Sequence, residues 1–102
     1  MGYHVELNTL LRPPNDFDFN SLITGKRYTV TLDRERAFPL RIAILLIDSE
    51  WNFYGYCVAH SAIVKDQKTI IKFEILTQFA PEEQKLYKRK FVIAAKMTGE
   101  IT

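Results

Sequence analysis

Residues 38–79 read FPLRIAILLIDSEWNFYGYCVAHSAIVKDQKTIIKFEILTQF. The stretch is rich in β-branched and aromatic residues, and short polar breaks at 48–50 and 65–68 divide it. Apolar and polar residues alternate most clearly in Thr69–Leu76. Alternation bounded by polar turn residues is typical of antiparallel strands with one buried face. We therefore predict three successive antiparallel strands within 38–47, 51–64 and 69–76.

The flanking sequence adds further strands and a helix. Alternation predicts strands over Tyr3–Leu11 and Arg27–Leu32, and a further strand is predicted over Phe91–Met97. Ala80-Pro81-Glu82-Glu83 predicts the start of a helix near 80–90, because proline in the first turn and acidic residues near the amino end are favoured. The predicted fold class is mainly β (α+β): a small antiparallel β-barrel of about six strands with one or two short helices. It spans 1–102 as a single domain and ends in a frayed tail at 98–102.

Three local signals refine this prediction. Phe17 and Phe19 alternate with aspartates, so we expect the loop after the first strand to pin two rings onto the core. Asn20 or Ser21 could cap a short helical turn, with the glycine at 25 in a left-handed position after it. Gly55 lies inside an aromatic run, which indicates a β-bulge or the close approach of another backbone.

Composition restricts the class of protein. The 102 residues are 47% hydrophobic and 25% charged, as in an ordinary globular domain, and Cys57 is the single cysteine. One cysteine cannot form an internal disulfide, and the sequence contains neither a secretory apolar segment nor an apolar run of membrane-spanning length. We expect a soluble cytoplasmic protein without a membrane partner.

The reactive side chains do not form a recognisable site. Cys57 and His60 could supply two zinc ligands, but a zinc site needs at least three from the protein, and strand positions three apart point to opposite faces. The same geometry argues against a cysteine–histidine nucleophile. The four glycines are scattered rather than gathered in a phosphate-binding loop. We expect no metal, no cofactor and no enzymatic activity.

Aromatic and basic residues carry the remaining functional signal. Trp51, Phe53, Tyr54 and Tyr56 crowd one segment, where they either fill the core or stack on unpaired bases, and the core interpretation is favoured. The net charge of +2 is too small to indicate nucleic acid by itself. Candidate nucleic-acid contacts are Lys26, Arg27, Arg34, Arg36, Arg41, Tyr54 and Tyr56. The basic residues of 85–90 are equally well explained as the carboxyl-terminal part of a helix, where cations are favoured.

The start Glu6-Leu7-Asn8-Thr9 resembles that of a small bacterial family of unknown function. Phe38-Pro39-Leu40 is similar to an aromatic-Pro-hydrophobic segment of that family, and the stretch from Gly55 to Ile71 is similar to a later one. The resemblance implies a PUA-like β-barrel. Residues 22–27 also resemble an ASCH pattern, and the PUA and ASCH group often binds RNA or modified bases.

Two hypotheses of different class follow. The first is a binding module for RNA or a nucleotide. The second is a protein-interaction or accessory domain that uses a strand edge or an aromatic face. A small-molecule pocket inside the barrel is a third possibility.

Overall fold

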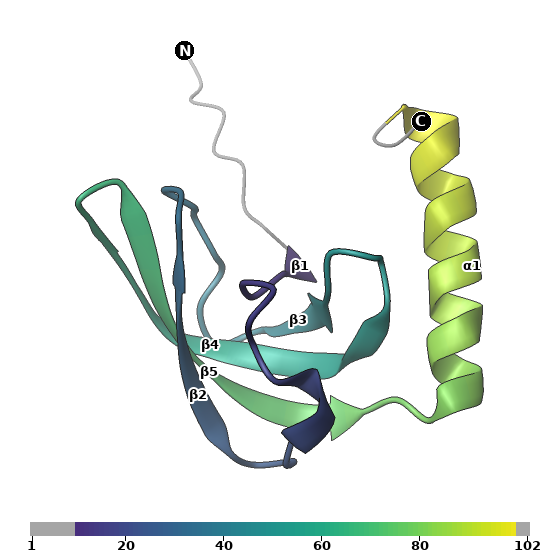
Figure 1. Cartoon of the computed structure of the whole chain (residues 1–102), viewed down its shortest axis with the longest axis horizontal. Coiled ribbons are helices and arrows are strands. Elements are labelled where there is room, and N and C mark those ends of the chain that lie inside the picture. Colours follow the sequence, from purple (N-terminus) through teal and green to yellow (C-terminus); the bar gives the residue numbers. More distant parts are fainter. Residues whose placement is uncertain (1–9, 100–102) are drawn as a thin grey trace.

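The structure is a computed structural model that describes residues 10–99 (Figure 1). One five-stranded sheet has the strand order β1-β3-β4-β5-β2. A 3-10 turn, η1, precedes β2, and a long helix, α1, follows β5. The elements are β1 (Leu10–Leu11), η1 (Phe19–Ser21), β2 (Arg27–Leu32), β3 (Ala43–Ile47), β4 (Phe53–Lys65), β5 (Lys68–Gln78) and α1 (Pro81–Thr98).

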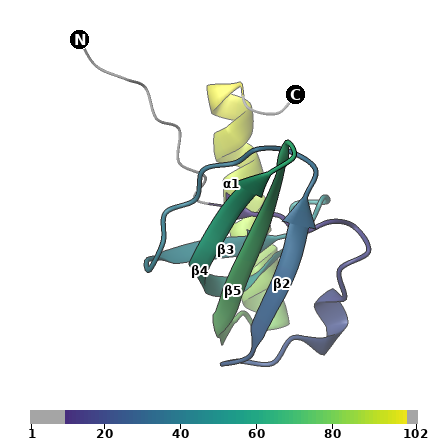
Figure 2. The same ribbon diagram turned by 90° about the vertical axis from the view of Figure 1, so that its left-hand side faces the viewer.

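The β4–β5 hairpin is the centre of the sheet and confirms the two strands predicted there. Asp66 and Gln67 form its two-residue turn, with φ of 53° and 62°. Two successive left-handed residues give the turn a twist that matches the twist of the flanking strands. β2 then pairs antiparallel with β5, from Arg27 opposite Glu74 to Leu32 opposite Thr69. Figure 2 shows β4, β5 and β2 side by side in this order.

The strand predicted over 38–47 is shorter than expected, because only Ala43–Ile47 is extended and paired. Pro39 has no N–H to donate to a ladder. Arg41 has φ of 65°, and its N–H donates to the carbonyl oxygen of Ala59 at 3.1 Å. This left-handed residue bends the chain just before β3 begins.

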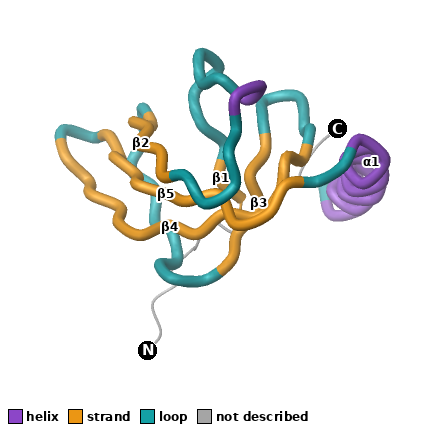
Figure 3. The backbone as a smooth tube through the Cα atoms, turned by 90° about the horizontal axis from the view of Figure 1, so that it is seen from below, coloured by secondary structure: helices purple, strands orange, loops and turns teal. Residues whose placement is uncertain are grey.

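Among the described residues the sheet has five strands, is mixed and does not close, so the prediction of a mainly β fold is confirmed and the finer prediction of a six-stranded antiparallel barrel is not. β1 pairs parallel with β3, Leu10 opposite Leu45 and Leu11 opposite Leu46. β1 and β2 are the two edges and do not pair with each other. The sheet is strongly curved without closing (Figure 3). The rest of the predicted strand over Tyr3–Leu11 lies outside the described residues.

The hydrophobic core lies on one face of the curved sheet. Its fully buried members include Leu11, Leu46, Cys57 and Phe73. The segment after β1 covers this face with Phe17 and with Phe19 of η1, as predicted, and these rings pack edge to face with centroids 5.0 Å apart. Their contacts hold the segment from β1 to β2 against the sheet.

The cap of η1 differs from the prediction, whereas the close approach at Gly55 agrees with it. Asp18, rather than Asn20 or Ser21, caps η1, and its carboxylate accepts the N–H of Asn20 at 3.0 Å. Gly55 lies between irregularities in the pairing with both neighbours, and a Cβ atom there would overlap the carbonyl oxygen of Thr77. The predicted close approach of another backbone to Gly55 is therefore confirmed.

α1 corrects the prediction of a strand over Phe91–Met97. The helix runs for 18 residues, starts with proline and two glutamates, and has Glu83 accepting the N–H of Ala80 at 2.9 Å. Tyr87, Phe91 and Ala95 recur every four residues and so share one helical face. Tyr87 and Phe91 both contact the ring of Phe53 at the start of β4, and Ala95 is buried. This packing outweighs the β-propensity of Val92 and Ile93.

α1 stands beside one end of the sheet and leaves the faces of the sheet uncovered (Figures 1 and 3). Its aromatic contacts are with Trp51, Phe53 and Phe79. Its last residue is Thr98, followed by Gly99 with φ of 82°, which is the left-handed cap that commonly ends a helix. The tail predicted over 98–102 therefore begins at the last residue of α1, and its residues 100–102 lie outside the described part.

Candidate functional site

The described surface contains a groove of about 680 Å³. Three segments line it: 10–15 after β1, 32–38 between β2 and β3, and 47–51 between β3 and β4. Its apolar lining includes Leu10, Phe38 and Ile47, and its basic lining is Arg12, Arg34 and Arg36. We call it the arginine groove. Its volume falls within the range that small-molecule sites occupy.

Thr69 holds the segment that carries two of these arginines. Its side chain is completely buried, and its hydroxyl oxygen accepts the N–H of Arg36 at 2.8 Å. The same hydroxyl donates to the carbonyl oxygen of Arg34 at 2.6 Å. Both bonds go to the backbone, so the two guanidinium groups remain available to a ligand. A buried β5 residue thus helps to fix this loop, together with Phe38, which is buried in the core.

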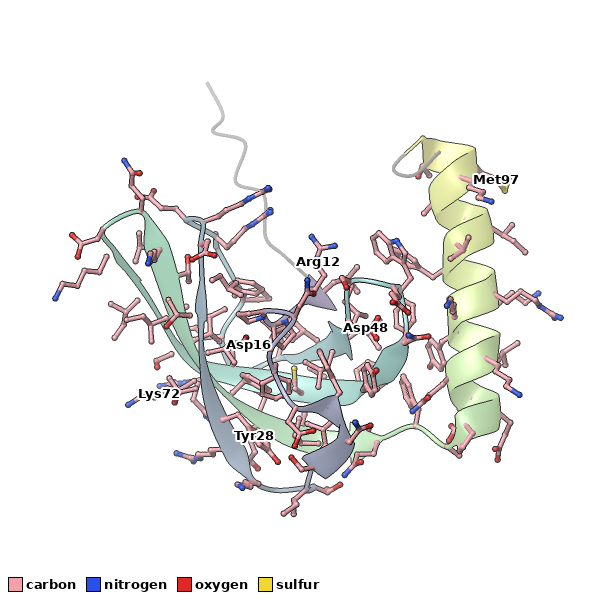
Figure 4. The ribbon with its side chains drawn as sticks, in the orientation of Figure 1. Arg12, Asp16, Tyr28, Asp48, Lys72 and Met97 are labelled. Atoms are coloured by element: carbon pink, nitrogen blue, oxygen red, sulfur yellow. The ribbon has the colours of Figure 1, made fainter. Side chains whose placement is uncertain are left out.

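Arg12 enters the groove from the other side. It follows Leu11, which is fully buried, and precedes Pro13, which is buried as well. This anchoring on both sides places an exposed arginine at the end of β1 (Figure 4). Sequence reasoning missed Arg12. The available signal was an arginine directly after an alternating strand and directly before two prolines.

The electrostatics of the groove favour an anion. It is lined by three arginines and one carboxylate, Asp33. Within residues 10–99, the ion pairs closer than 4.0 Å involve Arg27, His60 and Glu74, and none involves a groove arginine. Guanidinium groups bind phosphate and carboxylate through paired hydrogen bonds. The groove therefore offers cationic donors that form no ion pair with the described residues, beside an apolar lining.

The 48–52 turn contributes Ser49 and Trp51 to the lining of the groove. The Asp48 carboxylate accepts the backbone N–H groups of Glu50 and Asn52, each at 2.9 Å. It also accepts the amide of Asn52 and the hydroxyl of Tyr54, again at 2.9 Å. Burial acts to raise the pKa of Asp48, but these hydrogen bonds outweigh it and leave the pKa below its ordinary value. These hydrogen bonds fix the conformation of the 48–52 turn.

Trp51 sits at the tip of this turn and lines the groove. Its ring stacks on Phe91 of α1, with centroids 5.0 Å apart and planes 29° apart. Its backbone is left-handed, with φ of 65°. Lys88 of α1 donates to the Asn52 side chain at 3.3 Å, which ties the same turn to the helix. Sequence reasoning included Trp51 in the aromatic cluster that either fills the core or stacks on bases, but named Tyr54 and Tyr56, and not Trp51, as candidate contacts.

The structure brings together only Arg34 and Arg36 of the five predicted basic residues. Lys26 lies over the ring of Tyr28, with its nitrogen 5.2 Å from the ring centroid. Arg27 is 3.6 Å from the Glu74 carboxylate. Arg41 is exposed at the bend before β3 and does not line the groove.

Tyr54 and Tyr56 belong to two separate aromatic clusters, because the irregular pairing around Gly55 turns them apart. Tyr54 stacks on Phe19 at 4.5 Å, and burial together with its bond to Asp48 raises its pKa to about 12. Tyr56 packs edge to face on Phe79 at 5.6 Å. Both rings are half-buried in contacts of this kind, so neither presents a free stacking face at the groove.

Cys57 and His60 also lie apart. Cys57 is buried in the core, and burial raises the pKa of its thiol to about 12. His60 contacts Glu74, with Nε2 2.9 Å from the carboxylate. Across the described ranges, no group of three or more histidine, cysteine, aspartate or glutamate side chains could hold a metal ion. No helix of that part of the chain is long and apolar enough to cross a membrane.

Comparisons with known proteins support the fold. No family model matches the sequence, and no curated protein does. Among solved structures, the crystal structure of the protein YtmB from Bacillus subtilis, a structural genomics target, is similar with a TM-score of 0.56 and 23% sequence identity. The match covers 78% of this chain and 95% of YtmB. This chain therefore has a fold similar to that of YtmB over most of its length.

Proposed function

We propose that this protein is a non-enzymatic binding module for RNA or a nucleotide, and that it contacts phosphates in the arginine groove. One observation carries the proposal: Arg12, Arg34 and Arg36 line a single groove without carboxylate partners in the described part of the chain. Phosphate contacts by basic side chains supply most of the sequence-independent affinity for nucleic acids. A cytoplasmic location fits a chain whose one cysteine is a free thiol.

The apolar lining of the groove favours a nucleic-acid ligand over a free anion. A site for phosphate alone needs only cations and N–H donors. This groove adds the part-exposed Leu10 and Trp51, whose apolar surfaces match the faces of bases, whereas its other apolar residues, Phe38 and Ile47, are buried. The resemblance to the PUA and ASCH group points the same way, although the open edges at β1 and β2 distinguish this sheet from a closed barrel.

The test is fluorescence anisotropy with a labelled single-stranded RNA of mixed sequence, about 12 nucleotides long, at low salt. The variant carries Arg34→Ala and Arg36→Ala, which keep the backbone bonds to Thr69. The matched control carries Lys85→Ala and Lys90→Ala, which remove the same charge from exposed positions of α1. Weaker binding by the arginine variant alone is the expected result. Absent binding, or equal weakening in both variants, rules the proposal out.

A second candidate function is self-association through α1. Leu86, Ile93 and Met97 are exposed and lie within about 40° of one another around the helix, since each residue advances it by about 100°. Figure 4 shows Met97 on α1 away from the strands. Glu82 and Glu83 start this helix and Lys96 lies in its last turn, so two antiparallel copies would bring opposite charges together.

Analytical ultracentrifugation distinguishes this candidate. A dimer that dissociates on Leu86→Ser with Ile93→Ser supports it, because both side chains are exposed and their replacement leaves the core intact. A monomer at every concentration eliminates it.

A further inference from the structure

Trp51 has structural features that phosphate binding does not require. It is the single tryptophan of the chain, and it lines the same groove as the three arginines. Phe91 stacks on it from α1. An indole supported in this way is a rigid planar surface at the edge of a cationic groove.

The backbone of Trp51 is held in a costly conformation. A positive φ is uncommon for a residue with a bulky side chain, and such outliers cluster at ligand-binding sites. The N–H of Trp51 donates to the Asp48 carbonyl oxygen at 3.3 Å, and the Asp48 carboxylate accepts the N–H groups of both neighbours of Trp51. Lys88 fixes Asn52 from the helix. The ring is therefore oriented before any ligand arrives.

We infer that Trp51 is a stacking platform for an unpaired base whose neighbouring phosphate is held by the groove arginines. The inference rests on the proposed function and narrows its ligand to single-stranded RNA or a free nucleotide. A base in a duplex already stacks on its neighbours and cannot lie flat on the indole without leaving the helix. A sugar phosphate without a base would contact only the arginines.

A single tryptophan makes the test direct, because fluorescence excited at the red edge of indole absorption reports on Trp51 alone. The probes are a short oligoadenylate, the same strand paired with oligouridylate, and ribose 5-phosphate. Stacking predicts quenching by the oligoadenylate, none by ribose 5-phosphate, and weaker binding of the duplex.

Variants complete the test. Trp51→Leu should weaken oligoadenylate binding about 5- to 150-fold, the range measured when a stacking side chain is removed. Trp51→Phe keeps a ring against Phe91 and should retain most of the affinity. Circular dichroism and thermal melting establish that both variants are folded.

The outcomes separate this inference from the proposed function. If anisotropy detects no binding of any RNA, both are wrong. If oligoadenylate binds through Arg34 and Arg36 without quenching Trp51, or if Trp51→Leu binds as tightly as the native protein, the platform is wrong and the proposed function stands. Equal affinity for the duplex also overturns the platform.

Discussion

Replacing Thr69 by valine tests how the arginine groove is built. Valine keeps the size of the side chain and removes its hydroxyl, which makes bonds of 2.8 Å and 2.6 Å to the backbone of Arg36 and Arg34. The N–H of Arg36 and the carbonyl group of Arg34 would each lose a hydrogen-bond partner. Thr69 is completely buried, so its lost hydroxyl lies at a position shielded from water. The substitution therefore perturbs the loop without altering an arginine.

The magnitude follows from the two lost bonds. Each is worth about 0.5–1.5 kcal/mol net, so Thr69→Val should lower the free energy of unfolding by about 1–3 kcal/mol. For a domain of this size, about 2 kcal/mol corresponds to a fall in Tm of about 8–16 °C. Because the loop would no longer be fixed, RNA affinity should fall as well.

Thr69→Ser provides the control. It keeps the hydroxyl and loses one methyl group, which costs about 1 kcal/mol, and RNA binding should be unchanged. Urea denaturation and RNA anisotropy on the same preparations measure both effects. If Thr69→Val is as stable as the native protein and binds RNA as tightly as Thr69→Ser does, the hydroxyl does not anchor the loop and the reasoning fails.

Three further predictions concern the sheet, the turn and the core. Gly55→Ala should cost at least about 3 kcal/mol in urea denaturation because its Cβ overlaps a neighbouring carbonyl, whereas Gly25→Ala, with open space around it, should cost about 1–2 kcal/mol from its φ of 85°; equal costs would contradict the close approach. Asp48→Asn should destabilise the protein by about 1.5–3 kcal/mol at neutral pH, because an amide cannot accept all four hydrogen bonds. Folding lowers the pKa of Asp48, so its contribution is present above the ordinary value of 3.8 and is lost as the pH falls through the folded value; a difference between the two proteins that stays constant in acid would be inconsistent with that. Cys57 should react with a thiol reagent at pH 8 only after unfolding, since it is buried and its pKa is about 12; rapid labelling of the native protein would show that the core is open.

The sequence predicts the parts of this fold that depend on local pattern. Alternation in Thr69–Leu76 corresponds to β5, and the glycine at 55 marks a close approach. The parallel pairing of β1 with β3 was not predictable, because it joins residues 35 apart through backbone bonds that leave no side-chain pattern. Phe91–Met97 was misjudged because its apolar residues suit a strand or one helical face, and only contact with Trp51 and Phe53 favours the helix.

The candidate site was predictable only in part, for a similar reason. Arg34 and Arg36 were identified by charge. Arg12 and Trp51 join them through tertiary packing of segments distant in sequence, and the buried hydroxyl of Thr69 carries no sequence signal of its role. Lys26 and Arg27 carry the same charge as the groove arginines but contact Tyr28 and Glu74 instead.

The salt dependence of RNA binding tests the phosphate-binding groove most directly. Each phosphate contact on a single strand contributes a slope near −0.7 to the logarithm of the association constant against the logarithm of salt concentration. Three arginines in contact with phosphates should give about −2 for the native protein and about −0.7 for the Arg34→Ala, Arg36→Ala variant. An identical slope for both proteins would mean that the groove does not bind phosphates.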